Sequence, residues 1–288
     1  MKRRLFSLFL IAAMTFTFAT IVAASGDLDH RADREQNRSQ RERDRDHDSS
    51  QSGRDLPERD EVRQTYELTP GARVEVSGIN GSVDIETANG GTAEVHIVRS
   101  AHDRADLEFH KIVIEHSPDK LVVRGEKDRD RRSMGRSRQV RQRVMMRIPR
   151  QVDLLSSGIN GRVTVGAIDG PVQLSGINGR VDVAQARGFS HISGINGRVS
   201  VTITELGEKG IHVSGVNGGV ELQFAEELNA DLDVSAVNGS VSTEVPNVSI
   251  QGKLDRSNFR ARIGNGGSPI SVSGVNGRVR LSRAGVAG

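Results

Sequence analysis

The sequence predicts an all-β chain folded as a single-stranded β-helix, a solenoid of 18–21-residue coils with an antiparallel β meander capping its N-terminal side. Seven copies of one phrase, typically Ser-Gly-Ile-Asn-Gly-Arg-Val, carry this prediction. From position 160 the first five asparagines follow one another at intervals of 18, 18, 21 and 21 residues. Repetition at such a period is typical of architectures whose units pack only against their neighbours. Apolar residues alternate on both sides of each phrase, which indicates strands.

The N-terminal 24 residues are predicted to be a signal peptide. Three basic residues precede an apolar stretch from Leu5 to Ala24, and small residues at positions 22–24 favour cleavage before Ser25. The stretch is also long enough to stay uncleaved as a membrane anchor. In both cases the rest of the chain is exported, to the periplasm or the cell surface. Contact with a membrane is expected only through this segment, if it is uncleaved.

Residues 25–66 are predicted to be a disordered, charged linker, because they mix arginine with acidic residues and contain almost nothing apolar. The chain has no cysteine, so its stability cannot come from disulfides. Basic residues outnumber acidic ones by 40 to 37, and three of the basic residues fall in the signal peptide. The remaining charges balance, so the composition does not favour a nucleic-acid partner.

Residues 67–288 are predicted to form the β domain, interrupted at 91–150 by an insertion. Strand-like runs at 93–98, 109–116, 120–124 and 143–148 predict the meander that covers the open edge of the first coil. Residues 127–143 are rich in arginine and predict a basic loop. The 38-residue interval before the last phrase predicts two successive coils, with a corner near Asn258.

The phrase itself is predicted to be architectural. Val172 and Leu174 have one parity and Ile177 the other, so the strand must change phase near Gly176 to bury all three. The Asn-Gly pair is expected to form the corner, because both residues tolerate positive φ. Stacked strands lie ~4.8 Å apart, so equivalent asparagines can join in a ladder of side-chain amides. This structural ladder comprises Asn80, Asn160, Asn178, Asn196, Asn217, Asn238 and Asn276.

Arginine follows the Asn-Gly pair in four copies, at Arg162, Arg180, Arg198 and Arg278. In stacked coils the first three form a column of like charges. Their mutual repulsion is unfavourable unless an acidic residue such as Asp182 or an anionic ligand neutralises it. One hypothesis is a strip that binds an acidic glycan or a phosphate-bearing polymer. The alternative is a solvated face that discourages aggregation.

A second set of outward positions brings His191, His212 and Asp233 into one predicted column. Three such residues are few for a closed metal site, and we predict neither a metal nor another cofactor. Long β-helices can carry polysaccharide-cleaving enzymes, which need carboxylates paired at a fixed separation. No such pair recurs, aromatic residues are 3% of the chain, and no nucleophile motif is present. The prediction is a protein without catalytic activity.

The phrases resemble the bacterial putative-adhesin β-helix families, including the head-GIN type, which is named for a Gly-Ile-Asn triplet. That triplet stands at 78–80, 158–160, 176–178 and 194–196, and valine replaces isoleucine in later copies. The resemblance covers residues 67–288 and implies an exported protein that binds or scaffolds in the bacterial cell envelope. The expected partner is an acidic polysaccharide, another envelope polymer or an envelope protein. Two alternatives are a polysaccharide-cleaving enzyme and an accessory protein of envelope-stress signalling.

Overall fold

The computed structural model describes residues 56–127, 140–185, 188–203, 205–224, 229–245, 248–251 and 258–283. These residues belong to one compact unit, Leu56–Gly288. The predicted signal peptide, residues 25–55 of the predicted linker and residues 128–139 of the predicted basic loop lie outside the described residues. None of the helices in the described part of the chain has the length and apolar character that crossing a membrane requires.

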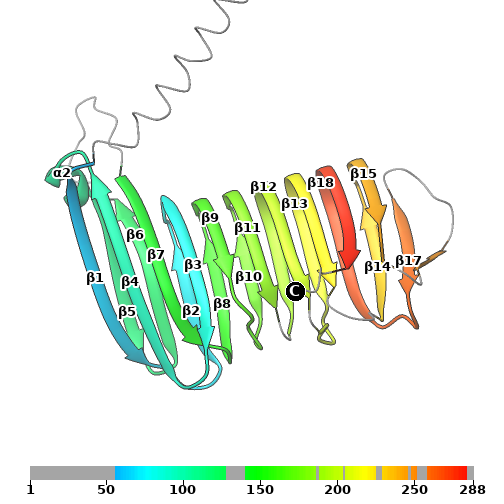
Figure 1. Cartoon of the computed structure of the whole chain (residues 1–288), viewed down its shortest axis with the longest axis horizontal. Coiled ribbons are helices and arrows are strands. Elements are labelled where there is room, and N and C mark those ends of the chain that lie inside the picture. The colour runs from blue at the N-terminus through cyan, green and yellow to red at the C-terminus, as the bar shows by residue number, and fades with distance from the viewer. Residues whose placement is uncertain are drawn as a thin grey trace, which may run out of the picture. The chain divides into compact units, whose positions relative to one another are not determined.

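The described strands belong to one 18-stranded sheet, and one short helix, α2 (Arg104–Phe109), lies at the end of the sheet where β1 and β4 are found (Figure 1). In chain order the strands are β1 (Glu58–Glu67), β2 (Ala72–Ser77), β3 (Gly81–Ala88), β4 (Thr92–Ala101), β5 (His110–Ser117), β6 (Lys120–Lys127), β7 (Val140–Pro149), β8 (Val152–Ser157), β9 (Asn160–Val165), β10 (Val172–Ser175), β11 (Asn178–Gln185), β12 (Ser190–Ile203), β13 (Ile211–Phe224), β14 (Ala230–Ser235), β15 (Asn238–Thr243), β16 (Val248–Gln251), β17 (Phe259–Ile263) and β18 (Ser268–Arg283).

The predicted single-stranded β-helix is wrong, because the sheet is mixed and its strands do not follow one another in chain order. We call each strand or strand pair that carries one copy of the phrase a layer. The layer β2–β3 pairs in parallel with β6–β7 on one side and with β8–β9 on the other. The last strand, β18, lies between β13 and the layer β14–β15 (Figure 1). A repeated phrase specifies which side chains match across strands, but it does not specify which copies become neighbours.

Antiparallel pairing occurs at both ends of the sheet, whereas the prediction placed it only at the N-terminal side. At one end β4 pairs antiparallel with β1 and β7, and β5 pairs antiparallel with β6. At the other end β17 pairs antiparallel with β14 and β16. The corner predicted near Asn258 therefore does not begin another parallel layer. Instead, the Asn258 side chain accepts a hydrogen bond from the Ala236 backbone N–H, at 2.8 Å.

Strand β1 lies almost entirely within the segment predicted to be linker, whose boundary at residue 66 is therefore wrong. Its charged side chains face partners on β4 rather than solvent alone. Asp60 pairs with Arg99, and Glu61 lies 2.8 Å from a ring nitrogen of His96. Ten residues of β1 pair in register with β4, and such cross-strand contacts are not predicted by a count of apolar residues.

The core runs through every layer. In β10–β11 the side chains of Val172, Leu174, Ile177, Val181 and Val183 are at most 3% exposed. The change of phase that buries both parities occurs where the glycine at position 176 has φ of 59°. The expectation that both residues of the Asn-Gly pair adopt positive φ is wrong for the asparagine, because no asparagine in the described residues does so, whereas Gly179 has φ of 151°. The bend belongs to the Ser-Gly pair that precedes it.

Candidate functional site

The phrase asparagines lie in one row that crosses the layers. Side-chain amide bonds of 3.1–3.4 Å run along the row, for example from Asn178 Nδ2 to Asn160 Oδ1 and from Asn160 Nδ2 to Asn80 Oδ1. Because of the strand order, Asn276 lies between Asn217 and Asn238. These side chains are exposed, yet their amides are engaged with one another. The row therefore links adjacent layers through side-chain hydrogen bonds.

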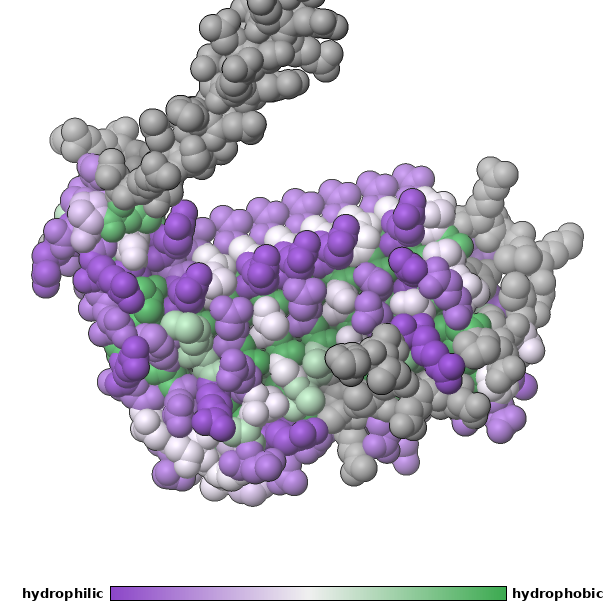
Figure 2. All heavy atoms as spheres, in the orientation of Figure 1, coloured by the Kyte–Doolittle hydropathy of each residue, from purple (hydrophilic) through white to green (hydrophobic). Residues whose placement is uncertain are grey.

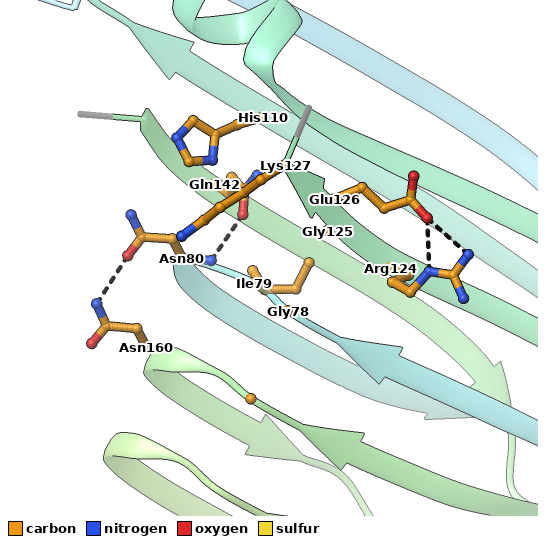
Figure 3. A pocket seen from close by; sticks show the side chains of 11 residues that line it. Gly78, Ile79, Asn80, His110, Arg124, Gly125, Glu126, Lys127, Gln142 and Asn160 are labelled. Carbon is orange, nitrogen blue, oxygen red and sulfur yellow. Dashed lines mark hydrogen bonds and ion pairs between the residues drawn. The ribbon is translucent and has the colours of Figure 1, made fainter. Parts of the chain in front are cut away.

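One end of the row is closed by a residue that the repeat does not contain. In the next layers each asparagine N–H donates to a carbonyl of the preceding layer, as Asn160 N–H does to Ile79 O at 2.9 Å. The Asn80 N–H instead donates to the side-chain carbonyl of Gln142, at 2.8 Å (Figure 3). Gln142 is 2% exposed. Sequence reasoning missed it, although one glutamine among alternating apolar residues of β7 is a visible signal.

A hollow of about 760 Å³ adjoins this end of the row. Figure 3 shows Arg124 at its rim, bound to Glu126, and Arg124 also pairs with Glu115 at 3.2 Å. The positive charge of Arg124 is thus neutralised by two carboxylates of the same chain. Lys127, the last described residue before position 140, is one of the residues that line the hollow, and we assign no ligand to it.

The four predicted arginines lie beside the asparagine row. Arg162, Arg180 and Arg198 occupy matching positions on β9, β11 and β12, which are neighbours in the sheet. Arg278 on β18 is two layers from Arg198, because β13 with Gly219 lies between them. Arg143 on β7 joins the same row, because it pairs in register with Ser82. We call these five side chains the arginine row.

All five side chains of the arginine row are exposed, and none forms an ion pair or hydrogen bond within the described part of the chain. Asp182, two residues beyond Arg180 on the same face, does not pair with any of them. Backbones of adjacent layers are ~4.8 Å apart, and like charges at about 4 Å repel by about 1 kcal/mol even in water. Figure 2 shows rows of hydrophilic side chains crossing the strands on the visible face. The arginine row is therefore an uncompensated line of positive charge.

The predicted column of His191, His212 and Asp233 is interrupted. His191 pairs in register with His212, but Ser271 of β18 lies between His212 and Asp233. Asp233 forms an ion pair with Arg260 at 3.0 Å. No group of three histidine, aspartate or glutamate residues in the described ranges is arranged to hold a metal ion. The insertion of β18 separates residues that the chain order would have placed together.

Several solved structures are similar to this chain at low sequence identity. A putative cell adhesion protein from Clostridium sporogenes is 8% identical, with 78% of this chain and 100% of that chain covered and a TM-score of 0.35. A putative adhesin from Bacteroides fragilis is 10% identical over 79% and 99% of the two chains, with a TM-score of 0.29. A putative lipid binding protein from Parabacteroides distasonis is 7% identical over 78% and 97%, with a TM-score of 0.27.

No family model and no curated protein matches the sequence. The narrower resemblance to the head-GIN type is not confirmed by any of these comparisons. The chain is thus similar, at low identity, to solved structures that are mostly described as putative adhesins.

Proposed function

We propose that this chain is an exported, non-catalytic binding protein of the bacterial cell envelope and that the arginine row is its contact surface for an acidic polymer. The partner is an acidic polysaccharide or a phosphate-bearing envelope polymer. Export follows from the first 24 residues, which carry the features of a signal peptide or anchor. The compartment is the periplasm or the cell surface.

The observation that carries this proposal is the absence of partners for the arginine row. Some described arginines lie against carboxylates, as Arg260 and Arg262 do against Asp233 and Asp231, and others off the row are also unpaired. The row is distinguished by unpaired arginines at matching positions of adjacent strands, as Arg162, Arg180 and Arg198 are. A guanidinium presents its donors in a planar fork that suits carboxylate and phosphate oxygens.

The geometry of the row favours an extended ligand. Arginines at matching positions of adjacent layers repeat at the strand spacing of ~4.8 Å, along a line that crosses the strands. A polymer with anionic groups at regular intervals can bind several arginines at once. Individually weak contacts then add through effective concentration, so affinity should rise steeply with polymer length.

The proposal is tested by measuring binding of the full chain to acidic and neutral polysaccharides of matched length. A triple variant, with Arg162, Arg180 and Arg198 each replaced by serine, should lose binding to the acidic polymers. The matched control replaces three other arginines with serine, namely Arg73, Arg104 and Arg283. These are exposed, lie off the row and form no ion pair in the described residues. This control has the same net charge as the triple variant and should bind as the unaltered chain does.

Equal losses in the two triple variants would mean that net charge alone drives binding, and the row would not be a site. Release of shortened fragments from a polymer would contradict the non-catalytic part of the proposal. Such release would instead support a polysaccharide-cleaving enzyme.

A further inference from the structure

The arginine row is interrupted once by a residue without a side chain. Gly219 of β13 lies between Arg198 of β12 and Arg278 of β18. The position forms a hollow of about 430 Å³, lined by these three residues together with Glu221 and Arg280. The hollow is therefore a local feature within the longer charged row.

Two of the three arginines around the hollow are free to bind a ligand. Arg280 donates to both carboxylate oxygens of Glu244, at 2.7 and 2.9 Å, and this contact raises the pKa of the Arg280 guanidinium. Glu221 accepts a hydrogen bond from the Gln223 amide, at 3.1 Å. Arg198 and Arg278 have no such contact within the described residues. The hollow thus lies between two guanidinium groups without an ion pair, and the Glu221 carboxylate is the one lining charge that opposes an anion there.

The missing side chain at position 219 is not required by the packing of the layers. At Gly218, the preceding residue, an added Cβ would lie 1.7 Å from the Gly197 carbonyl oxygen, so glycine is needed there. At Gly219 an added Cβ would meet only the Arg278 carbonyl oxygen, at 3.7 Å, which is ordinary contact. Strands favour residues with side chains over glycine. The hollow at Gly219 is therefore not a consequence of close packing between the layers, because a side chain would fit there.

We propose that this hollow is a subsite for a tetrahedral oxyanion, a phosphate or sulfate group, held between Arg198 and Arg278. The inference rests on the proposed function, because the anion would be a substituent of the polymer that follows the row. A carboxylate has two oxygens, which one guanidinium fork can satisfy. A phosphate group offers three acceptor oxygens and can accept from both arginines at once. Because β13 lies between β12 and β18, the Arg198 and Arg278 side chains are separated by one strand, and the phosphate group would enter between them from solvent.

The test uses the full chain titrated with inorganic phosphate, sulfate and acetate at constant ionic strength, with the backbone amide signals followed by NMR. Phosphate or sulfate should shift the amides of Gly218, Gly219 and Gly277 in a saturable way, whereas acetate should not. Replacing Gly219 with glutamine fills the hollow without adding charge and should weaken binding by about tenfold or more. Arg278→Ser, a surface change, should do the same. Arg73→Ser, an exposed change off the arginine row, should leave the phosphate affinity unchanged.

A Gly219→Arg variant separates the hollow from general attraction to the row. If the hollow is the subsite, the new side chain occupies it and phosphate affinity falls, although one positive charge is added. If attraction to the row alone operates, phosphate affinity rises, and the proposed subsite is wrong. Equal shifts with acetate, or shifts spread evenly along the row, would also overturn it. In these cases, binding of acidic polymers that the Arg162, Arg180 and Arg198 triple variant loses would still support the proposed function.

Discussion

The stacking of the layers can be tested at one atom by the substitution Gly179→Ala. From Gly161 onward, the glycine that follows each phrase asparagine packs against the same glycine of a neighbouring layer. A Cβ at Gly179 would lie 1.9 Å from the carbonyl oxygen of Gly161, far inside van der Waals contact. The backbone φ at this position is 151°, a conformation that side chains with a Cβ rarely adopt.

Two costs add in this variant. Holding alanine at the observed φ costs about 1–3 kcal/mol. Relieving the clash moves β11 away from β9 by more than 1 Å, which weakens one or two interlayer hydrogen bonds at about 0.5–1.5 kcal/mol each. The free energy of unfolding should therefore fall by about 2–6 kcal/mol. Urea denaturation followed by far-ultraviolet circular dichroism measures this change.

The matched control is Gly219→Ala. This glycine belongs to the copy of the phrase on β13 and stands one position after the Asn-Gly pair. Its Cβ meets nothing closer than 3.7 Å, so the expected change in stability is at most about 1 kcal/mol and is stabilising in sign. Equal effects of the two alanines would contradict the reasoning, because it would mean that the layers do not approach in the register described here.

Three further predictions concern the asparagine row and the first strand. Asn178→Ala should cost about 0.5–1 kcal/mol in thermal or urea unfolding, because the lost amide bond is solvent-exposed; a cost above 3 kcal/mol would show that the row bears more of the stability. Gln142→Leu should cost about 1–3 kcal/mol, since it leaves the Asn80 N–H without its acceptor, and an unchanged urea midpoint would contradict this role. A hydrogen bond from Arg63 lowers the pKa of Glu61 in the folded chain below its ordinary value of 4.5. The contribution of Glu61 to folding stability is therefore present above pH 4.5 and is lost as the pH falls through the lowered pKa of the folded state. The protection of β1 amides against hydrogen exchange, taken as the ratio of intrinsic to observed exchange rate, should therefore fall below pH 4.5 in the unaltered chain and change less in the Glu61→Gln variant.

The repeated phrase predicts side-chain register well because register depends on local pattern. The asparagines and three of the arginines occupy matching positions, as equal spacing implies. The same pattern does not predict the order of layers, because every copy of the phrase can pair with every other copy. The 38-residue interval shows this limit. It contains β16 and β17, which pair antiparallel, and the chain then returns to insert β18 beside β13.

Two members of the candidate site that sequence reasoning missed, Gln142 and Arg143, belong to β7, which does not carry the phrase. Arg143 extends the arginine row only because β7 is the parallel neighbour of β3, which no spacing in the sequence indicates. The hollow at Gly219 depends on the place of β18, since Arg278 lies beside Gly219 only because β18 is inserted next to β13. Long-range strand pairing, rather than local propensity, determines these contacts.

The central claim is that uncompensated arginines of one row bind an acidic polymer, and the salt dependence of binding tests it most directly. Affinity for a polyanion falls as salt rises, with a slope that reflects the number of charge contacts. Co-sedimentation of the full chain with bacterial envelope fragments should therefore weaken steeply between low and high salt. The Arg162, Arg180 and Arg198 triple serine variant should show weaker binding and a shallower slope. Identical slopes for the variant and the unaltered chain would contradict the claim.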